Sequence, residues 1–236
     1  MRFVTCSKYI LCALAISFTA TSHSVKSAEA PQAADKNAST QQATQTLKTH
    51  LAELTSYRGK FTQTITDAQG VLLQESHGVM SLQKPNQLRW EVNFPDDSLF
   101  VADGEVMYNL DPFVEQVTLM SQAGLVESNP LMLLISDEQS AWDNVLISVA
   151  EGNDKDKLEN NSEGLETYLV SSKSLNSSTQ LLTLTFKSGI LQSLKSIDKQ
   201  GQLSQITFSD IEQNGLIAAS AFRVDVPDTY VVDDQR

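Results

Sequence analysis

Side chains that could perform catalysis or bind a metal are sparse in this 236-residue sequence. The two cysteines, Cys6 and Cys12, both lie within the first dozen residues. His50 and His77 are far apart, whereas a two-histidine zinc motif places the pair about three or four residues apart, with a further ligand nearby. The sequence also lacks the Gly-x-Ser-x-Gly turn of serine hydrolases and the glycine-rich loops that bind phosphates. These patterns predict neither a cofactor nor a metal site.

Adjacent carboxylates are the remaining candidates for catalysis. Asp96–Asp97 and Asp233–Asp234 could act as acid and base in hydrolysis, but 29 acidic residues make such pairs common. We therefore expect a protein that is not an enzyme, with a secreted hydrolase as an alternative. The 29 acidic and 17 basic residues give a net charge of −12, which repels phosphate backbones and excludes nucleic acid as a partner.

The N-terminus has the pattern of a secretory signal peptide. Arg2 and Lys8 are followed by the apolar run 9–20, which is too short to span the ~30 Å of a bilayer core as a helix. We predict a signal peptide over 1–27, cleaved after Ser27. Cleavage leaves 14 basic and 29 acidic residues, a net charge of −15, and removes both cysteines. The exported chain would then fold without a disulfide.

The exported chain is predicted to be one domain preceded by a short tether. Residues 28–38 lack large apolar side chains and are expected to be flexible, and residues 39–236 form the domain. Ser39 and Gln42 have the spacing of a capping box that opens a helix. The apolar side chains of this helix recur every three or four residues, at Ala43, Leu47, Leu51 and Leu54. This amphipathic helix must cover another apolar surface.

From Tyr57 onward, apolar residues alternate with polar ones, which is typical of strands. Strands are predicted near 57–66, 71–82, 87–94, 98–102, 106–110, 113–119, 144–149, 165–171, 180–187, 190–198, 202–213 and 221–226. Tight turns between them require antiparallel neighbours, because a parallel pair needs a crossover of about a dozen residues or more. A short apolar helix is predicted over 131–135, after Pro130. The fold class is mainly β with α: a curved antiparallel sheet of about 11 strands with few helices.

Several blocks of the sequence resemble one known family. They occur in order from about residue 40 to the end: Phe61-Thr-Gln63, Lys84-Pro-Asn86 with Trp90, Asp103-Gly104, Asp111-Pro-Phe-Val-Glu-Gln116, Asn129-Pro-Leu-Met-Leu133 and Val232-Asp-Asp-Gln-Arg236. On these blocks the chain is similar to the LolA family of periplasmic outer-membrane lipoprotein carriers. Two of them, the block over 111–116 and the C-terminal block, are the most specific.

The resemblance implies a half-barrel sheet covered by a helical lid, which encloses an apolar cavity for acyl chains. It implies three partners: acylated lipoproteins, an ATP-driven inner-membrane complex that releases them, and an outer-membrane lipoprotein receptor. A soluble monomer in the periplasm is expected, since Cys12 lies inside the apolar run and not after it, where a lipid-modified cysteine belongs. Another periplasmic lipid-binding or envelope-stress-sensing module of similar fold is the main alternative.

The resemblance also implies which residues form the site. The expected cavity and lid residues are Leu47, Leu51, Leu54, Phe61, Ile65, Leu88, Trp90, Phe100, Phe113 and Met132. Lys84 stands where the family has an arginine that holds the lid closed, and Leu88 stands where it has an aromatic residue. Lysine keeps the positive charge of arginine but not its planar, five-donor geometry. Our hypothesis is that the lid leucines fill the empty cavity and that acyl chains displace them.

Overall fold

The structure, a computed structural model, describes residues 31–122, 130–136, 139–150, 164–174 and 177–236. Its strands are β1 (Ser56–Thr66), β2 (Leu72–Gln83), β3 (Gln87–Phe94), β4 (Ser98–Ala102), β5 (Val106–Asp111), β6 (Gln116–Ser121), β7 (Val145–Val149), β8 (Leu165–Ser172), β9 (Thr179–Lys187), β10 (Ile190–Asp198), β11 (Leu203–Gln213) and β12 (Val231–Asp234). Its helices are α1 (Pro31–Glu53), η1 (Pro130–Leu134), α3 (Gln139–Asp143) and η3 (Ala219–Phe222). The predicted signal peptide lies outside the described residues.

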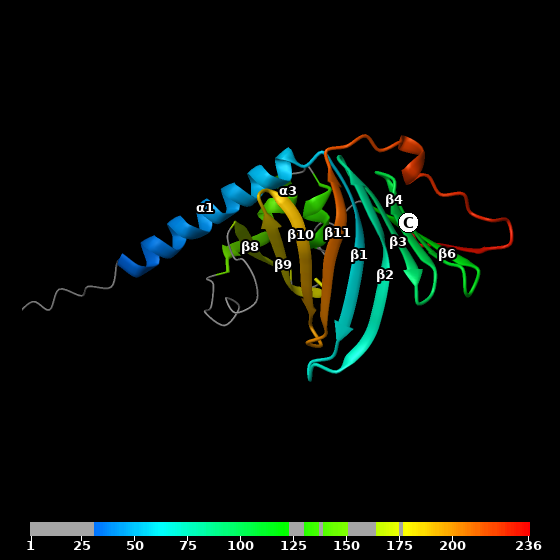
Figure 1. Ribbon diagram of the computed structural model, residues 1–236, viewed down its shortest axis with the longest axis horizontal. Helices are drawn as coiled ribbons and strands as arrows, with labels where there is room; N and C mark the ends of the chain where they lie inside the picture. The colour runs from blue at the N-terminus through cyan, green and yellow to red at the C-terminus, as the bar shows by residue number, and fades with distance from the viewer. Residues whose placement is uncertain (1–30, 123–129, 137–138, 151–163, 175–176) are drawn as a thin grey trace, which may run out of the picture.

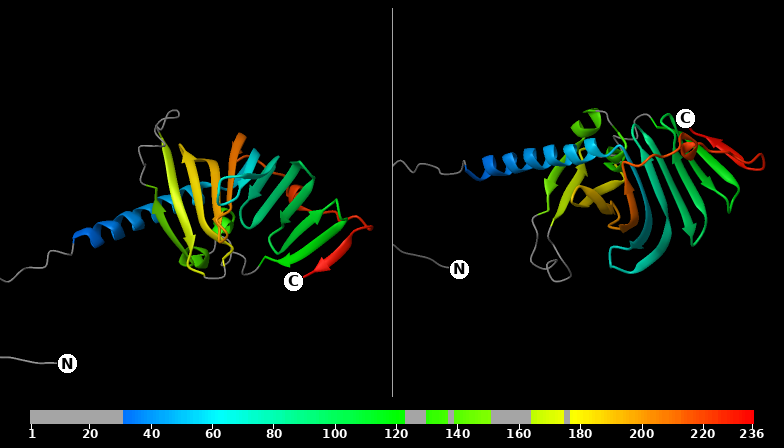
Figure 2. Two further views of the ribbon diagram at one scale, coloured as in Figure 1. Left: turned by 90° about the horizontal axis from the view of Figure 1, so that it is seen from below. Right: turned by 45° about the horizontal axis from the view of Figure 1, so that its top comes forward.

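All twelve strands form one open, curved sheet (Figures 1 and 2). The order is β12-β6-β5-β4-β3-β2-β1-β11-β10-β9-β8-β7, so two antiparallel meanders meet where β1 pairs with β11. The exception to antiparallel pairing is β12, which runs parallel to β6. The predicted antiparallel sheet with few helices is confirmed, and the described residues form twelve strands in place of about eleven.

The last predicted strand is wrong. Residues 221–226 alternate in polarity, but the structure has η3 and an extended segment there, and the last strand is Val231–Asp234. Both edges of β11 are already occupied, by β1 and β10, so the chain leaving β11 finds no free edge beside it. It crosses to the far edge of the sheet, where β12 adds to β6 (Figure 1).

The N-terminal helix is longer than predicted. It begins at Pro31, so residues 31–38, expected to be flexible, are helical, and Ser39 and Gln42 lie inside the helix and not at its start. Proline is favoured at the first helical position, and the alanine- and glutamine-rich residues that follow have high helix propensity. The N-terminal half of α1 projects beyond the sheet (Figure 2).

The core lies between the concave face of the sheet and the helices that cover it. We call α1, η1 and α3 together the lid. Lid residues and inward-facing strand residues belong to one buried apolar cluster. The predicted short helix after Pro130 is present as the 3₁₀ helix η1, and it is anchored to the β2–β3 turn because Asn86 N–H donates to the Ile135 carbonyl at 2.9 Å. α3 is tied to α1, since Lys48 Nζ lies 5.1 Å from the centre of the Trp142 ring.

Candidate functional site

The concave face is apolar because strand alternation points one side chain in two toward the lid. The inward, buried side chains of the strands include Phe61, Met80, Leu82, Leu88, Met107, Ile147, Tyr168, Val170, Leu182, Leu184, Leu194, Ile206 and Phe208. They come from both meanders, so the apolar surface runs continuously across the middle of the sheet.

Leucines of the lid pack against part of this apolar surface. Leu47 and Leu51 of α1 are 0% exposed, and Leu54, the residue that follows α1 and continues its leucine stripe, is 2% exposed; all three belong to the same buried cluster as the strand residues. Met132 of η1 joins them and is 3% exposed. The predicted helix stripe therefore lies against the predicted apolar surface.

Lys84 ties the lid to the sheet. Its Nζ donates a hydrogen bond of 2.8 Å to the Leu51 carbonyl, in the last turn of α1. The last carbonyls of a helix have no partner within the helix, and a cation there also interacts favourably with the helix dipole. Asn214, which follows β11, makes a second tie, because its Nδ2 donates to the Glu53 carbonyl at 2.9 Å.

A third tie joins α1 to β8. His50 Nε2 lies 2.5 Å from Glu166 Oε2, and this carboxylate also accepts a hydrogen bond of 2.7 Å from the Tyr168 hydroxyl. The His50 ring stacks on Phe186 at 5.2 Å between centroids. The hydrogen bonds from Tyr168 and then His50 lower the pKa of Glu166, whereas burial raises the pKa of Tyr168. Sequence reasoning gave His50 no role, although its place in the last helical turn suits a cation.

Beside the part that the lid covers, the concave face has an open hollow of about 260 Å³. Its residues come from β1, β3, β9, β10 and β11: Gln63, Trp90, Thr179, Leu182, Leu194, Ser196, Ser204 and Ile206. Trp90 forms one wall and stacks on Phe61 with 4.1 Å between ring centroids. Gly78 lies opposite Phe61 on β2, and a Cβ there would come within 2.6 Å of Phe61 Cζ. Because glycine has no side chain, this position provides the space that the Phe61 ring occupies in its stack with Trp90.

The remaining predicted residues divide between this site and its surroundings. Leu88 is buried in the cluster, and Trp90 and Phe100 pack against it while partly exposed. Ile65 lies on the same face of β1 as Gln63, outside the buried cluster. These positions agree with an apolar cavity, whose ligand stays a proposal.

Phe113 lies apart from the other predicted residues. It is 87% exposed in the β5–β6 turn and, with Asp96 and Asp97, lines a neighbouring hollow of about 310 Å³ to which Gln63 also contributes. The prediction placed it in a strand, but Asp111 Oδ1 accepts the Phe113 N–H at 2.9 Å and closes a turn there. The structure therefore does not bring Phe113 to the lid.

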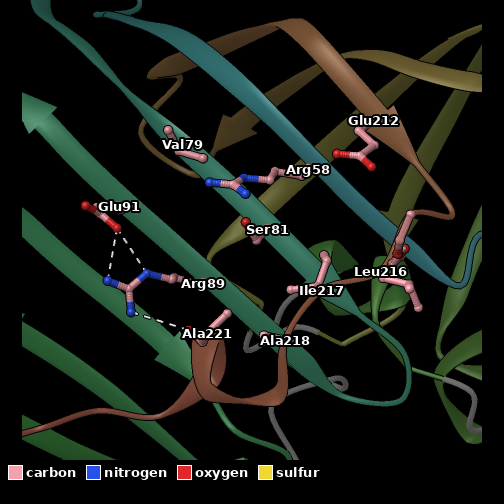
Figure 3. A pocket seen from close by; sticks show the side chains of 12 residues that line it. Arg58, Val79, Ser81, Arg89, Glu91, Glu212, Leu216, Ile217, Ala218 and Ala221 are labelled. Atoms are coloured by element: carbon pink, nitrogen blue, oxygen red, sulfur yellow. Dashed lines mark hydrogen bonds and ion pairs between the residues drawn. The ribbon is translucent and has the colours of Figure 1, made fainter.

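The convex face carries a different hollow, of about 320 Å³, beneath the segment that follows β11 (Figure 3). Arg58, Ser81 and Arg89 line it from the sheet side. Arg89 pairs with Glu91 at 3.0 Å and donates to the Ala221 carbonyl at 3.4 Å. The hydrogen bond to Ala221 fastens the C-terminal segment to the sheet.

The described residues contain no group of three or more His, Cys, Asp or Glu side chains placed to hold a metal ion. In the same part of the chain, no helix has the length and apolarity needed to cross a membrane. The chemistry that the site offers is burial of apolar surface beside a few neutral polar groups.

Comparison with known proteins matches the sequence to a family. A family model described as outer membrane lipoprotein carrier protein LolA matches residues 52–225. An outer-membrane lipoprotein carrier protein of Pseudoalteromonas translucida is 34% identical over 194 residues, covering 81% of this chain and 86% of that protein. The protein of the same name from Vibrio cholerae is 32% identical, covering 81% and 89%. A crystal structure of a LolA superfamily protein from Nitrosomonas europaea, 9% identical, covers 77% of this chain and 98% of that one with a TM-score of 0.42. The sequence matches show that this chain belongs to the LolA family of outer membrane lipoprotein carrier proteins.

Proposed function

We propose that this protein carries lipoproteins through the periplasm by holding their acyl chains against the concave face of the sheet. An ATP-driven inner-membrane complex would load it, and an outer-membrane lipoprotein receptor would accept the cargo. The protein acts as a monomeric chaperone and catalyses no reaction. The relatives named outer-membrane lipoprotein carrier protein support this role.

The observation that carries the proposal is an apolar sheet face covered by the lid helices. Each methylene exposed to water costs ~0.8 kcal/mol, so a single long acyl chain costs roughly 10 kcal/mol to expose. A lipoprotein with such chains needs a protein that shields them in water. The concave face supplies apolar surface without directional bonds, as such a carrier requires.

The lid leucines fill the place that the acyl chains take. Leu47, Leu51 and Leu54 are buried against the concave face, so acyl chains that enter must displace them. Opening is then an equilibrium between two states, which cargo shifts because it contacts only the open one.

Loading by Leu51→Glu tests this proposal. Inner-membrane vesicles that hold labelled lipoprotein and the releasing complex are incubated with the carrier and ATP, and soluble one-to-one complexes are counted. The unmodified carrier should release the lipoprotein, and Leu51→Glu should release at least tenfold less, because its charge must enter the apolar face. The matched control is Ala52→Glu, which adds the same charge at the neighbouring, exposed position.

Two results would contradict the proposal. Normal loading by a folded Leu51→Glu variant would show that the lid leucines do not occupy the cargo site. Binding of free fatty acids without any release of lipoprotein would favour a general periplasmic lipid binder.

A further inference from the structure

The hollow beside the lid contains polar groups that an acyl-binding surface does not need. Gln63 points inward from the central strand β1, one inward position beyond Phe61, where alternation otherwise selects apolar residues. Ser204 and Ser196 continue from it across β11 and β10, since these two serines face each other in the β10–β11 pair. A polar row on the apolar face of a central strand breaks the local pattern, and such breaks mark functional positions.

Hydrogen bonds to neighbouring strands hold the Gln63 amide in place. Its Nε2 donates to Ser204 Oγ at 2.8 Å, and its Oε1 accepts from Ser76 Oγ at 3.2 Å. Ser76 is 2% exposed, so the β2 end of this network is buried. A glutamine amide has two N–H donors and two acceptor positions on its oxygen. These two bonds use one of the two N–H donors, and the second is left for a ligand beside Gln63.

The lining of the hollow also selects the chemistry of its ligand. Trp90, Leu182 and Leu194 provide apolar walls beside the polar row. The described residues that line the hollow include no lysine, arginine or histidine. An anionic carboxylate or phosphate group would lose its hydration without gaining a cation, which is costly. A neutral carbonyl needs a single hydrogen-bond donor.

We infer that Gln63, with Ser196 and Ser204, is a subsite for the ester and amide carbonyls that join acyl chains to the lipoprotein cysteine. This inference rests on the proposed function, because it names the part of the same cargo that meets the polar row. The acyl chain lies along Trp90 and Leu194, and its carbonyl oxygen accepts the free N–H of Gln63. The subsite thereby favours acyl esters and amides over free fatty acids, whose carboxylate is charged.

The test compares two lipopeptides that differ in the ester carbonyl groups alone. One is a peptide whose N-terminal cysteine carries an S-dipalmitoylglyceryl group, and the other carries the same group with ether-linked chains of the same length, so that both have the same amino group. The variant is Gln63→Met, which has similar size and no amide. The control is Gln205→Met, which makes the same change on the outward face of β11, next to inward-facing Ile206. Binding is measured by isothermal titration calorimetry, and folding by thermal unfolding.

We expect Gln63→Met to bind the ester lipopeptide about threefold to tenfold more weakly, the loss of one hydrogen bond, and the ether lipopeptide within twofold of the unmodified protein. Gln205→Met should bind both normally. Ser196→Ala, which leaves the ties of Gln63 intact, should show a smaller loss for the ester form and provides the test if Gln63→Met does not fold. Equal losses for both lipopeptides, or no loss, would overturn the subsite. Failure of the unmodified protein to bind either lipopeptide would instead refute the proposed function.

Discussion

Replacing Lys84 by methionine should make the lid open more often. Methionine keeps most of the aliphatic length of lysine and removes the Nζ, which donates to the Leu51 carbonyl at 2.8 Å. Hydrogen bonds to charged groups contribute about 1.5–3 kcal/mol, and partial exposure of Lys84 reduces this to about 1–2 kcal/mol. Since 1.4 kcal/mol corresponds to a factor of ten, the open population should rise roughly fivefold to thirtyfold.

Thiol labelling measures this opening directly. Residues 28–236 contain no cysteine, so Leu47→Cys introduces a single thiol at a position that is 0% exposed while the lid is closed. Its labelling rate is proportional to the open population when closing is fast compared with labelling. Adding Lys84→Met should accelerate labelling by the same fivefold to thirtyfold.

Two controls separate lid opening from other effects. Lys60→Met removes a lysine whose side chain is 67% exposed, and the labelling rate at position 47 should not change. Val117→Cys reports opening of the sheet from a fully buried position in β6, and Lys84→Met should leave its rate unchanged. Equal acceleration by Lys84→Met and Lys60→Met, or no acceleration by either, would show that Lys84 does not hold the lid closed.

Two further predictions concern stability. Glu166 has a pKa lowered from 4.5, so its contribution to folding is present above pH 4.5 and is lost as the pH falls through the lowered value. Glu166→Gln should therefore lower the thermal unfolding midpoint at pH 7, and the difference from the unmodified protein should shrink below pH 4.5; a constant difference would contradict this. Gly78→Ala should destabilise the fold by about 2–4 kcal/mol in urea unfolding, because the added methyl would overlap the Glu91 carbonyl oxygen and crowd Phe61. A loss under 0.5 kcal/mol would show that β2 moves to accommodate it.

The strands could be predicted from the sequence because their determinants are local. Alternation of polarity and tight turns fixed most strands to within one or two residues, as at Gln87–Phe94 and Ile190–Asp198. The leucine stripe of α1 was readable for the same reason, since the period of a helix places its members on one face. The segment 221–226 has an equally good local pattern, but a strand also needs a free neighbouring edge. Edge availability depends on the whole topology.

The site was only partly predictable for a related reason. The resemblance to a family pointed to Lys84, and the structure shows the carbonyl that it contacts. His50 and Glu166 are 116 residues apart, and they meet only because β8 lies under α1. The inward residues of β9 and β10, such as Leu182 and Leu194, follow from alternation once the direction of the concave face is known. Sequence alone does not give that direction.

Bound acyl chains can offset most of the free energy that is lost when the lid leucines leave the concave face. Burying a leucine side chain is favourable by ~1.5–3 kcal/mol, so displacing Leu47, Leu51 and Leu54 costs ~5–9 kcal/mol. At ~0.8 kcal/mol for each methylene, ~6–11 methylenes of acyl chain offset that cost, fewer than one long chain provides. Cargo does not restore the ties made by Lys84, Asn214 and His50, because each joins α1 to the sheet. These polar ties, more than the apolar contacts, therefore set how readily the carrier loads and releases cargo.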